Sequence, residues 1–362
     1  MLHERQSWTL EARQFSVIGW PDDTPTPLPG EPPTQPRGGI ELTALYRQYR
    51  IKSKKGRSHR PLTIEYYEQV IGSLERWAGR TLFSDEIGDD LVAEYLDWRA
   101  VAGRARGKGG VAVGTRNKEL RALHALHTFA TQQGWCTQPL QIEEEEEDEA
   151  NLECWSLAEM GSIIAQARTL DYDICGFPAS HWWEALFWIL YDVGGRINAT
   201  MNLAWGKVRL THCIVPTITL PCGAQKQRRD QVLPISEETA EALRRLATLN
   251  GQPRGPGDLV FPWPYDPPLK KTGRRTWGRL RYHFKTRILQ PLGLPDDRLS
   301  KFHKIRRTNG TFTFLTEGDI GKAQQRLGHS HVRVTEGYID QTKVEQVTPT
   351  YKPLPRPDVR ES

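Results

Sequence analysis

The C-terminal quarter of the chain carries His303-Lys304-Ile305-Arg306, followed by Leu327-Gly328-His329-Ser330 and then by Tyr338. The first quartet places a histidine and an arginine one helical turn apart. The second quartet places another histidine in a loop punctuated by glycine. Cations and imidazoles gathered around one phenol favour an attack by that phenol on an anion, and a phosphodiester is the obvious candidate.

The bulk composition is that of a soluble protein with about two domains. The chain has 362 residues, of which 38% are hydrophobic and 26% are charged. No apolar run is long enough to span a bilayer, and Met1–Ser16 lacks the apolar core of a secretory signal. We therefore expect a cytoplasmic protein, associated with the nucleoid if its partner is DNA.

The cysteines and the charges narrow the class further. The five cysteines are scattered without a Cys-x-x-Cys pair, which favours free thiols in a reducing compartment over a disulfide framework or a zinc site. Cys213 and Cys222 are the one pair that a hairpin would bring face to face. The net charge is +5, but Glu143–Glu149 is entirely acidic, so the rest of the chain is more basic than the total indicates. Such a body suits a polyanionic partner.

Composition divides the chain into five parts. We predict a Pro-rich flexible arm over 1–37, a helical domain over 38–135, an acidic linker over 136–151, a second domain over 152–345 and a Pro-rich tail over 346–362. Because like charges repel one another, the linker is expected to be solvated and extended.

Helical periodicity is clear in the first domain. One face of a predicted helix carries Tyr67, Val70, Ile71, Leu74 and Trp77. Thr63 is expected to cap that helix, Asp89 or Asp90 to cap the next, and Thr115 to begin a third that ends at Gly134.

The second domain mixes helices and strands. A strongly apolar helix is predicted over 182–193, and strands are predicted over 214–220 and 231–235. Ser236 is expected to cap the helix that follows them. The stretch 269–287 carries basic residues without an acid and is predicted to form a helix that contacts DNA phosphates or enters the major groove.

Basic residues in the connectors and helices of both domains are the candidates for DNA contacts, although solvated surface loops explain those of the first domain about as well. The candidate set is Lys54, Lys55, Arg57, Arg104, Arg106, Lys108, Arg116, Lys118, Lys270, Lys271, Arg274 and Arg275.

Cleavage of a DNA strand by a protein nucleophile needs an attacking oxygen, positive charge on the phosphate oxygens, an acid for the leaving oxygen and a base for the nucleophile. Two arginines suit the phosphate because guanidinium binds it bidentately and stays charged. A lysine can protonate the leaving group and imidazoles can carry protons. A phosphotyrosine conserves the energy of the phosphodiester, so neither ATP, metal nor cofactor is required.

At these positions the chain resembles the tyrosine recombinases, or phage integrases. The family's catalytic set of arginine, hairpin lysine, His-x-x-Arg, second histidine and tyrosine is similar, in order, to Arg196, Lys226, His303, Arg306, His329 and Tyr338. The resemblance covers 38–345. It implies a mainly helical, two-domain fold: a SAM-like core-binding domain and a mixed α/β catalytic domain with a small hairpin sheet, closed like a clamp around duplex DNA.

The resemblance also implies a mechanism. Tyr338 would attack the scissile phosphate to give a 3′-phosphotyrosine, while Arg196, Arg306 and His329 stabilise the transition state. Lys226 would protonate the leaving 5′-oxygen, and His303 would assist proton transfer. Rejoining would proceed through a Holliday junction in a tetramer on DNA, with the tail docked on a neighbour. Phage integration, transposition and resolution of plasmids or chromosome dimers all remain open as roles.

Three departures from the family pattern are visible. Ala199 stands where an acid usually follows the first arginine, so either another group orients Arg196 or Arg196 is held less firmly. Arg307 replaces a common histidine and is expected to add charge near the phosphate. Asn309-Gly310 replaces a more apolar pair and is expected to loosen the start of its helix. The alternatives are a type IB topoisomerase-like enzyme, a hairpin telomere resolvase and an inactive DNA-binding regulator.

Overall fold

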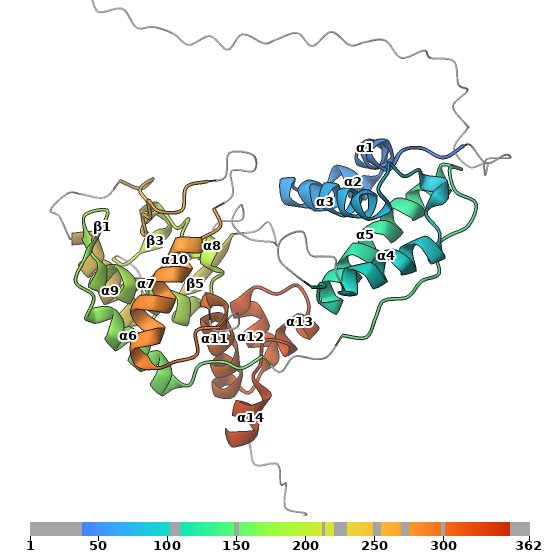
Figure 1. Cartoon of the computed structure of the whole chain (residues 1–362). Coiled ribbons are helices and arrows are strands. Elements are labelled where there is room, and N and C mark those ends of the chain that lie inside the picture. Colours follow the sequence, from blue (N-terminus) through green and yellow to red (C-terminus); the bar gives the residue numbers. More distant parts are fainter. Residues whose placement is uncertain are drawn as a thin grey trace, which may run out of the picture. The chain divides into compact units, whose positions relative to one another are not determined.

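A computed structural model of the chain describes residues 38–101, 109–147, 152–211, 214–220, 230–248, 255–268, 275–297 and 301–347. These residues form two compact units, one ending at Glu147 and the other containing the residues from 152 onward (Figure 1). None of the helices that the structure describes has the length and apolarity needed to cross a membrane.

The first unit is helical, as predicted. Its elements are α1 Leu42–Lys52, α2 Lys54–Arg57, α3 Pro61–Ala78, the 3-10 turn η1 Ser84–Glu86, α4 Asp89–Val101 and α5 Val113–Gln132. The apolar faces meet in one core, in which Leu45, Leu74, Tyr95 and Leu123 are almost fully buried. Burial of this apolar surface stabilises the unit.

Three helix starts in this unit differ from the prediction, and one of them is only two residues early, since α5 begins at Val113, before Thr115. Pro61, whose ring suits the first helical position, begins α3, so Thr63 lies inside the helix. The Asp89 carboxylate does not cap α4 and instead accepts hydrogen bonds from the backbone N–H groups of Gln141 and Ile142, at 2.8 Å and 3.1 Å. The basic connector after α1 is also partly helical, since it forms α2.

Arg99 and Glu119 form a buried ion pair between α4 and α5. Nε and Nη2 of Arg99 donate to the two Glu119 oxygens at 2.8 Å and 2.5 Å, and the Tyr95 hydroxyl donates to the same carboxylate at 2.9 Å. The side chains of Arg99 and Glu119 are 9% and 6% exposed. The three groups therefore satisfy one another in a place where water cannot.

The acidic run lies along α5. The carboxylate of Glu145 pairs bidentately with Arg116, and that of Glu144 pairs bidentately with Arg121. The Asn117 side chain exchanges hydrogen bonds with the Glu145 backbone, 2.7 Å to its carbonyl and 3.0 Å from its N–H. Residues 143–147 are extended and exposed, as predicted, but they are bound to α5 and are not a free linker.

The second unit combines helices with two small antiparallel sheets, which confirms the predicted mixed fold. In chain order its elements are α6 Leu157–Arg168, β1 Asp173–Ile174, β2 Phe177–Pro178, α7 Ala179–Val193, α8 Ile197–Thr200, η2 Trp205–Lys207, β3 Val208–Arg209, β4 Thr217–Leu220, β5 Gln231–Pro234, α9 Glu237–Thr248, α10 Gly278–His283, the π-helical turn η4 Phe284–Leu289, η5 Gln290–Leu292, α11 Phe302–Glu317, α12 Ile320–Leu327, α13 Val332–Glu336 and α14 Gln341–Val347. The sheet orders are β1-β2 and β3-β4-β5.

Helix α7 is the centre of this unit. Trp182, Trp183 and Phe187 are fully buried along it, and α6, α9 and α11 pack around it. Ser236 caps α9 as predicted, because its Oγ accepts from the Thr239 N–H at 3.2 Å. The buried Asp192 carboxylate also binds this helix start, accepting from the Ser236 N–H at 2.6 Å. The end of α7 is therefore fixed by its neighbours.

The predicted helix over 269–287 is shorter than expected. Residues 269–274 lie outside the described part of the chain, and α10 begins only at Gly278. Trp277 precedes it with a left-handed backbone, φ 54°, which a helix does not admit. The buried Asp266 carboxylate caps the new start by accepting from the N–H groups of Arg279 and Leu280, at 3.1 Å and 3.0 Å.

Replacing Glu119 by Ala is expected to lower the free energy of unfolding of the first unit by about 3–5 kcal/mol, because it leaves the Arg99 charge buried without a partner. Urea denaturation followed by far-UV circular dichroism measures the loss. Arg80→Ala, which removes the exposed pair with Glu86, is the control and should leave the transition nearly unchanged. Equal midpoints for the two variants would contradict the prediction.

Candidate active site

Helix α11 carries the first two site residues. Phe302 and Ile305 are buried in the core of the second unit and fix the first turn of α11. His303 and Arg306 lie next to these two buried residues, one helical turn apart, as predicted. Gly318, in the left-handed conformation, ends the helix.

Arg306 joins three separate segments of the chain. Its Nη1 donates to the Gly194 carbonyl at the end of α7, and its Nη2 donates to the Leu327 carbonyl at the end of α12, at 2.6 Å. Nη2 is also 2.9 Å from Nε2 of His329. The side chain is buried, and within the described residues its Nε has no partner. One guanidinium thus sets the relative positions of the loops that form the site, and its Nε–H makes none of these bonds.

Arg196 lies beside Arg306. It stands at the start of α8, directly after the glycines that end α7, and it is half-buried. Both arginines line a cavity of roughly 10 Å³, room for about one water molecule, together with Ala199 and Gln231. Burial and the Arg196 charge lower the pKa of Arg306 to about 10, so Arg306 remains charged at neutral pH. The two cations converge where an anion is needed to balance them.

The hydrogen bonds of His329 define its tautomer. Arginine has only donors, so the Nε2 of His329 must accept from Arg306. Nδ1 then carries the proton and faces the Thr335 Oγ1 at 3.1 Å. Burial, and then the charges of Arg306 and Arg196, lower the pKa of His329 to about 3. His329 is therefore a neutral imidazole at physiological pH.

Tyr338 lies in the turn between α13 and α14. Its hydroxyl is 2.5 Å from Nε2 of His303. Its ring centre is 4.6 Å from that of His329 and 5.5 Å from the guanidinium carbon of Arg306. The structure therefore brings together five of the six predicted catalytic residues, and the sixth, Lys226, lies outside the described residues.

Another histidine of the second unit, His283, has partners outside this cluster. His283 ends α10 and stacks on Tyr265, with the ring centres 6.0 Å apart. Tyr351 lies outside the described residues, as do Cys213 and Cys222 and the terminal parts 1–37 and 348–362.

Two departures in α11 turn out to be packing requirements. The prediction that Asn309-Gly310 loosens the helix is wrong. The Asn309 amide donates to the carbonyls of Tyr191 and Asp192 at 2.7 Å and 2.9 Å, which ties α11 to the end of α7. A Cβ atom on Gly310 would lie 2.8 Å from the side chain of Leu327, so glycine leaves room for this side chain of α12.

Arg307 bonds α11 to the chain segment that precedes α6. The expectation that it adds charge near the phosphate stays a prediction; the side chain is buried, and its Nε donates to the Glu153 carbonyl at 2.9 Å. Thr335 is a site residue that sequence reasoning missed, and the role of Asn309 was also missed, because its partners come from a distant part of the chain.

The candidate DNA contacts differ in whether their side chains are exposed or already bound to another group of the protein. Lys54, Lys55, Arg57 and Lys118 are exposed. Arg116 is engaged with Glu145, and Arg275 donates to the Trp263 carbonyl at 3.2 Å. Outside the described residues are Arg104, Arg106, Lys108, Lys270, Lys271 and Arg274.

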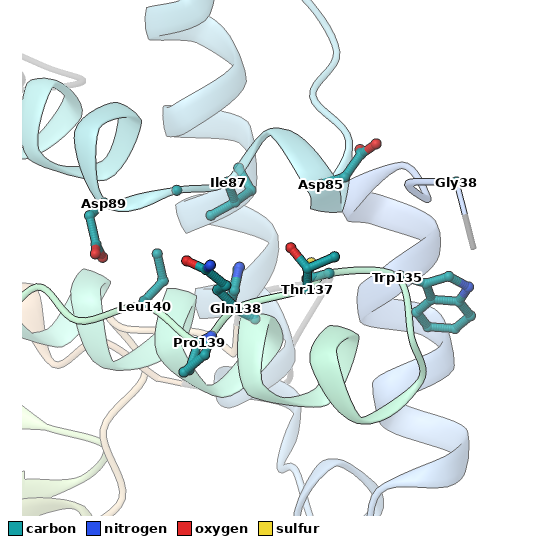
Figure 2. Close-up of a pocket in the computed structure, with 12 residues that line it drawn as sticks. Gly38, Asp85, Ile87, Asp89, Trp135, Thr137, Gln138, Pro139 and Leu140 are labelled. Carbon is teal, nitrogen blue, oxygen red and sulfur yellow. The ribbon is translucent and has the colours of Figure 1, made fainter. Parts of the chain in front are cut away.

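A pocket of the first unit offers no comparable chemistry. Figure 2 shows its lining, where Asp85 and Asp89 supply the charge and Trp135 closes one end. Because its charged side chains are carboxylates, this hollow repels phosphate.

The model of the phage integrase family matches residues 158–345, a little over half of the chain. The chain belongs to the phage integrase family. The match covers the described site, from the arginine after α7 to Tyr338.

Individual relatives agree with this assignment. The tyrosine recombinase XerC of Actinobacillus pleuropneumoniae serotype 7 (strain AP76) is 26% identical over 156 residues, which are 42% of this chain and 45% of that protein. The chain thus matches less than half of that relative's length. The Tn1549 transposon integrase in complex with circular intermediate DNA has a similar fold, with a TM-score of 0.57, 17% identity and coverage of 85% of this chain and 99% of that one. A lambda integrase dimer bound to a COC′ core site also has a similar fold, with a TM-score of 0.56, 15% identity and coverage of 88% of this chain and 81% of that one.

The depressed pKa of His329 predicts a pH dependence. The unfolded chain binds a proton at this side chain below about pH 6.5, and the folded chain does so only near pH 3, so stability is lost as the pH falls through this window. At pH 5 the loss is about 2 kcal/mol.

Two measurements check this. The imidazole NMR signals of His329 should not titrate between pH 8 and pH 5, and His329→Gln should flatten the pH dependence of the unfolding free energy. A His329 midpoint near pH 6.5 would show that the side chain is solvated, contrary to the structure.

Proposed function

We propose that this protein is a site-specific DNA recombinase that cleaves and rejoins duplex DNA through Tyr338. The single observation that carries the proposal is the 2.5 Å contact between the Tyr338 hydroxyl and Nε2 of His303, beside the buried Arg306. Membership of the phage integrase family supports it, as does the fold shared with integrases that were solved on DNA.

In the first step, the Tyr338 oxygen forms a bond to phosphorus, and the bond from phosphorus to the 5′-oxygen breaks. His303 receives the phenol proton, because its Nε2 already contacts the hydroxyl. Arg196 and Arg306 balance the charge that develops on the non-bridging oxygens, and the unpartnered Nε of Arg306 is a donor for one of them. Lys226 protonates the 5′-oxygen, which leaves as a hydroxyl.

His329 acts without a charge of its own. Its Nε2 is occupied by Arg306 and its Nδ1 faces Thr335. We therefore assign His329 to orienting Arg306, which in turn meets the phosphate. A buried neutral imidazole also avoids a third positive charge beside Arg196 and Arg306.

Rejoining reverses the chemistry. A 5′-hydroxyl of a partner duplex attacks the phosphotyrosine and releases Tyr338, so that two exchanges pass through a Holliday junction. The phosphodiester energy is conserved in the adduct, and the step draws on neither ATP nor a metal. We extend the proposal to a tetramer that assembles on DNA in the cytoplasm.

DNA binding is proposed for both units. The exposed Lys54, Lys55, Arg57 and Lys118 serve as phosphate contacts in the first unit. In the second unit we assign the basic stretch 269–287, whose helical part α10 is held by the Asp266 cap. Arg116 can contribute only after it exchanges Glu145 for a phosphate.

The rivals differ in what happens after cleavage. A type IB topoisomerase-like enzyme or a telomere resolvase would use the same first step. An inactive regulator is disfavoured, because Ala199 has not disrupted the site: Arg306 keeps its partners, and Tyr338 contacts His303. Relaxation of supercoiled DNA without strand exchange would support the topoisomerase alternative.

Tyr338→Phe should bind DNA with unchanged affinity and form no covalent adduct, because it lacks only the attacking oxygen. A nicked suicide duplex, from which the cleaved fragment diffuses away, traps the adduct of the unmodified protein on a denaturing gel. Tyr351→Phe is the control and should retain the adduct. Adducts that persist in the Tyr338 variant would refute the assignment.

The acidic run gives a second test. Replacing Glu144 and Glu145 by Gln removes the bidentate partners of Arg121 and Arg116, while Glu147 stays 3.8 Å from Arg121. Affinity for DNA should therefore rise, and the slope of log affinity against log salt should steepen by up to about 2. Replacing Glu143 and Glu146 by Gln removes the same charge without freeing either arginine. The prediction fails if the two double variants have the same salt slope.

A further inference from the structure

The segment that holds Tyr338 is fastened at both ends. Before it, the Tyr338 N–H donates to the Thr335 carbonyl at 2.8 Å, and Thr335 is the partner of His329. After it, Asp340 is fully buried, with 0% of its surface exposed. A buried carboxylate two positions beyond the proposed nucleophile needs a physical explanation, because burial of an ionised group is costly unless it is hydrogen-bonded.

Asp340 makes hydrogen bonds to three different parts of the second unit. Its Oδ2 accepts from the Cys154 N–H at 2.8 Å. Its Oδ1 accepts from the N–H and hydroxyl of Thr342, at 3.1 Å and 2.6 Å, at the start of α14. Its own N–H donates to the Thr311 Oγ1 on α11 at 3.0 Å. The donors to its carboxylate are neutral, so these contacts are directional and fix its position.

Residues 152–155, here called the entering segment, lead the chain into the second unit and are held on the same side. The Trp155 N–H donates to the Thr308 Oγ1 at 2.9 Å, and the Glu153 carbonyl accepts from Arg307. The entering segment is thus bonded to α11 at two positions and to Asp340 at a third. Since α11 also carries His303 and Arg306, these contacts place the entering segment, the catalytic helix and the Tyr338 turn in one frame.

We propose that Asp340 is a positioning residue for Tyr338, and that it works by bonding the Tyr338 turn to the entering segment and to α11. The inference rests on the proposed function. Thr311 adds to the same arrangement, because its hydroxyl faces the Tyr338 carbonyl at 3.4 Å. Without the Asp340 carboxylate the turn keeps its backbone links to Thr335 and Thr311 but loses those to the entering segment and to the start of α14.

The test compares Asp340→Ala and Asp340→Asn with the full-length protein on the nicked suicide duplex. We expect Asp340→Ala to lower the single-turnover rate of adduct formation at least tenfold at saturating protein, with the DNA dissociation constant unchanged within twofold. Asp340→Asn keeps one oxygen that can accept, but its NH2 group faces N–H and O–H donors and cannot bond to them. Its rate of adduct formation should lie between those of Asp340→Ala and the unmodified protein. It also serves if the alanine variant fails to fold.

The matched control is Asp319→Ala. Asp319 caps α12 by accepting from the Gly321 N–H at 2.7 Å and does not contact the Tyr338 turn. Its loss removes a capping carboxylate of the same unit, so it should slow adduct formation by no more than twofold.

Hydrogen exchange separates positioning from a general effect on stability. Asp340→Ala should speed amide exchange in the Tyr338 turn and the entering segment, while α7 and the middle of α11 stay protected. A cleavage rate within twofold of the unmodified protein overturns the inference, and so does faster exchange throughout the second unit. If the unmodified protein forms no adduct at all, the proposed function fails instead, so the two failures are distinguishable.

Discussion

The buried guanidinium of Arg306 is the interaction on which the rest of the site depends. It binds the Gly194 carbonyl before Arg196, the Leu327 carbonyl before His329, and the His329 imidazole itself. Each hydrogen bond fixes the position of a loop whose conformation would otherwise depend only on the residues next to it in the chain. Burial strengthens these bonds, because the guanidinium has no water to replace its partners. Burial of His329 and the neighbouring arginine charges keep that imidazole neutral, and we therefore propose that the two arginines carry the charge and that His303 takes the proton.

The fold was predictable wherever a strong periodic pattern coincided with local chemistry. The apolar helix ending at Val193, the strands on either side of the hairpin and the cap at Ser236 all follow from nearby residues. The helix starts at Pro61 and Gly278 were not predicted. The first depends on the ring of proline, and the second depends on Asp266, a capping carboxylate that tertiary packing brings to the N-terminus of α10.

For the site, the residues that we propose to react could be named from the sequence, but not the groups that hold them. His303, Arg306, His329 and Tyr338 are recognisable because they lie in short boxes. Asn309, Thr335 and Asp340 are not, since each acts through a partner that folding alone brings near. The missing acid at Ala199 illustrates the same limit. The sequence left open which group orients Arg196, and the structure packs Ala199 and Gln231 around a cavity shared by Arg196 and Arg306.

The central claim is that Tyr338 becomes joined to DNA within this frame. The most direct measurement is to trap the complex on a nicked duplex, digest it with protease and nuclease, and identify the modified peptide by mass spectrometry. The account predicts a single peptide that contains Tyr338, carrying the phosphate of a 3′ end and leaving a free 5′-hydroxyl on the other fragment. An adduct on another residue, attachment through a 5′ phosphate, or cleavage without any adduct would contradict it.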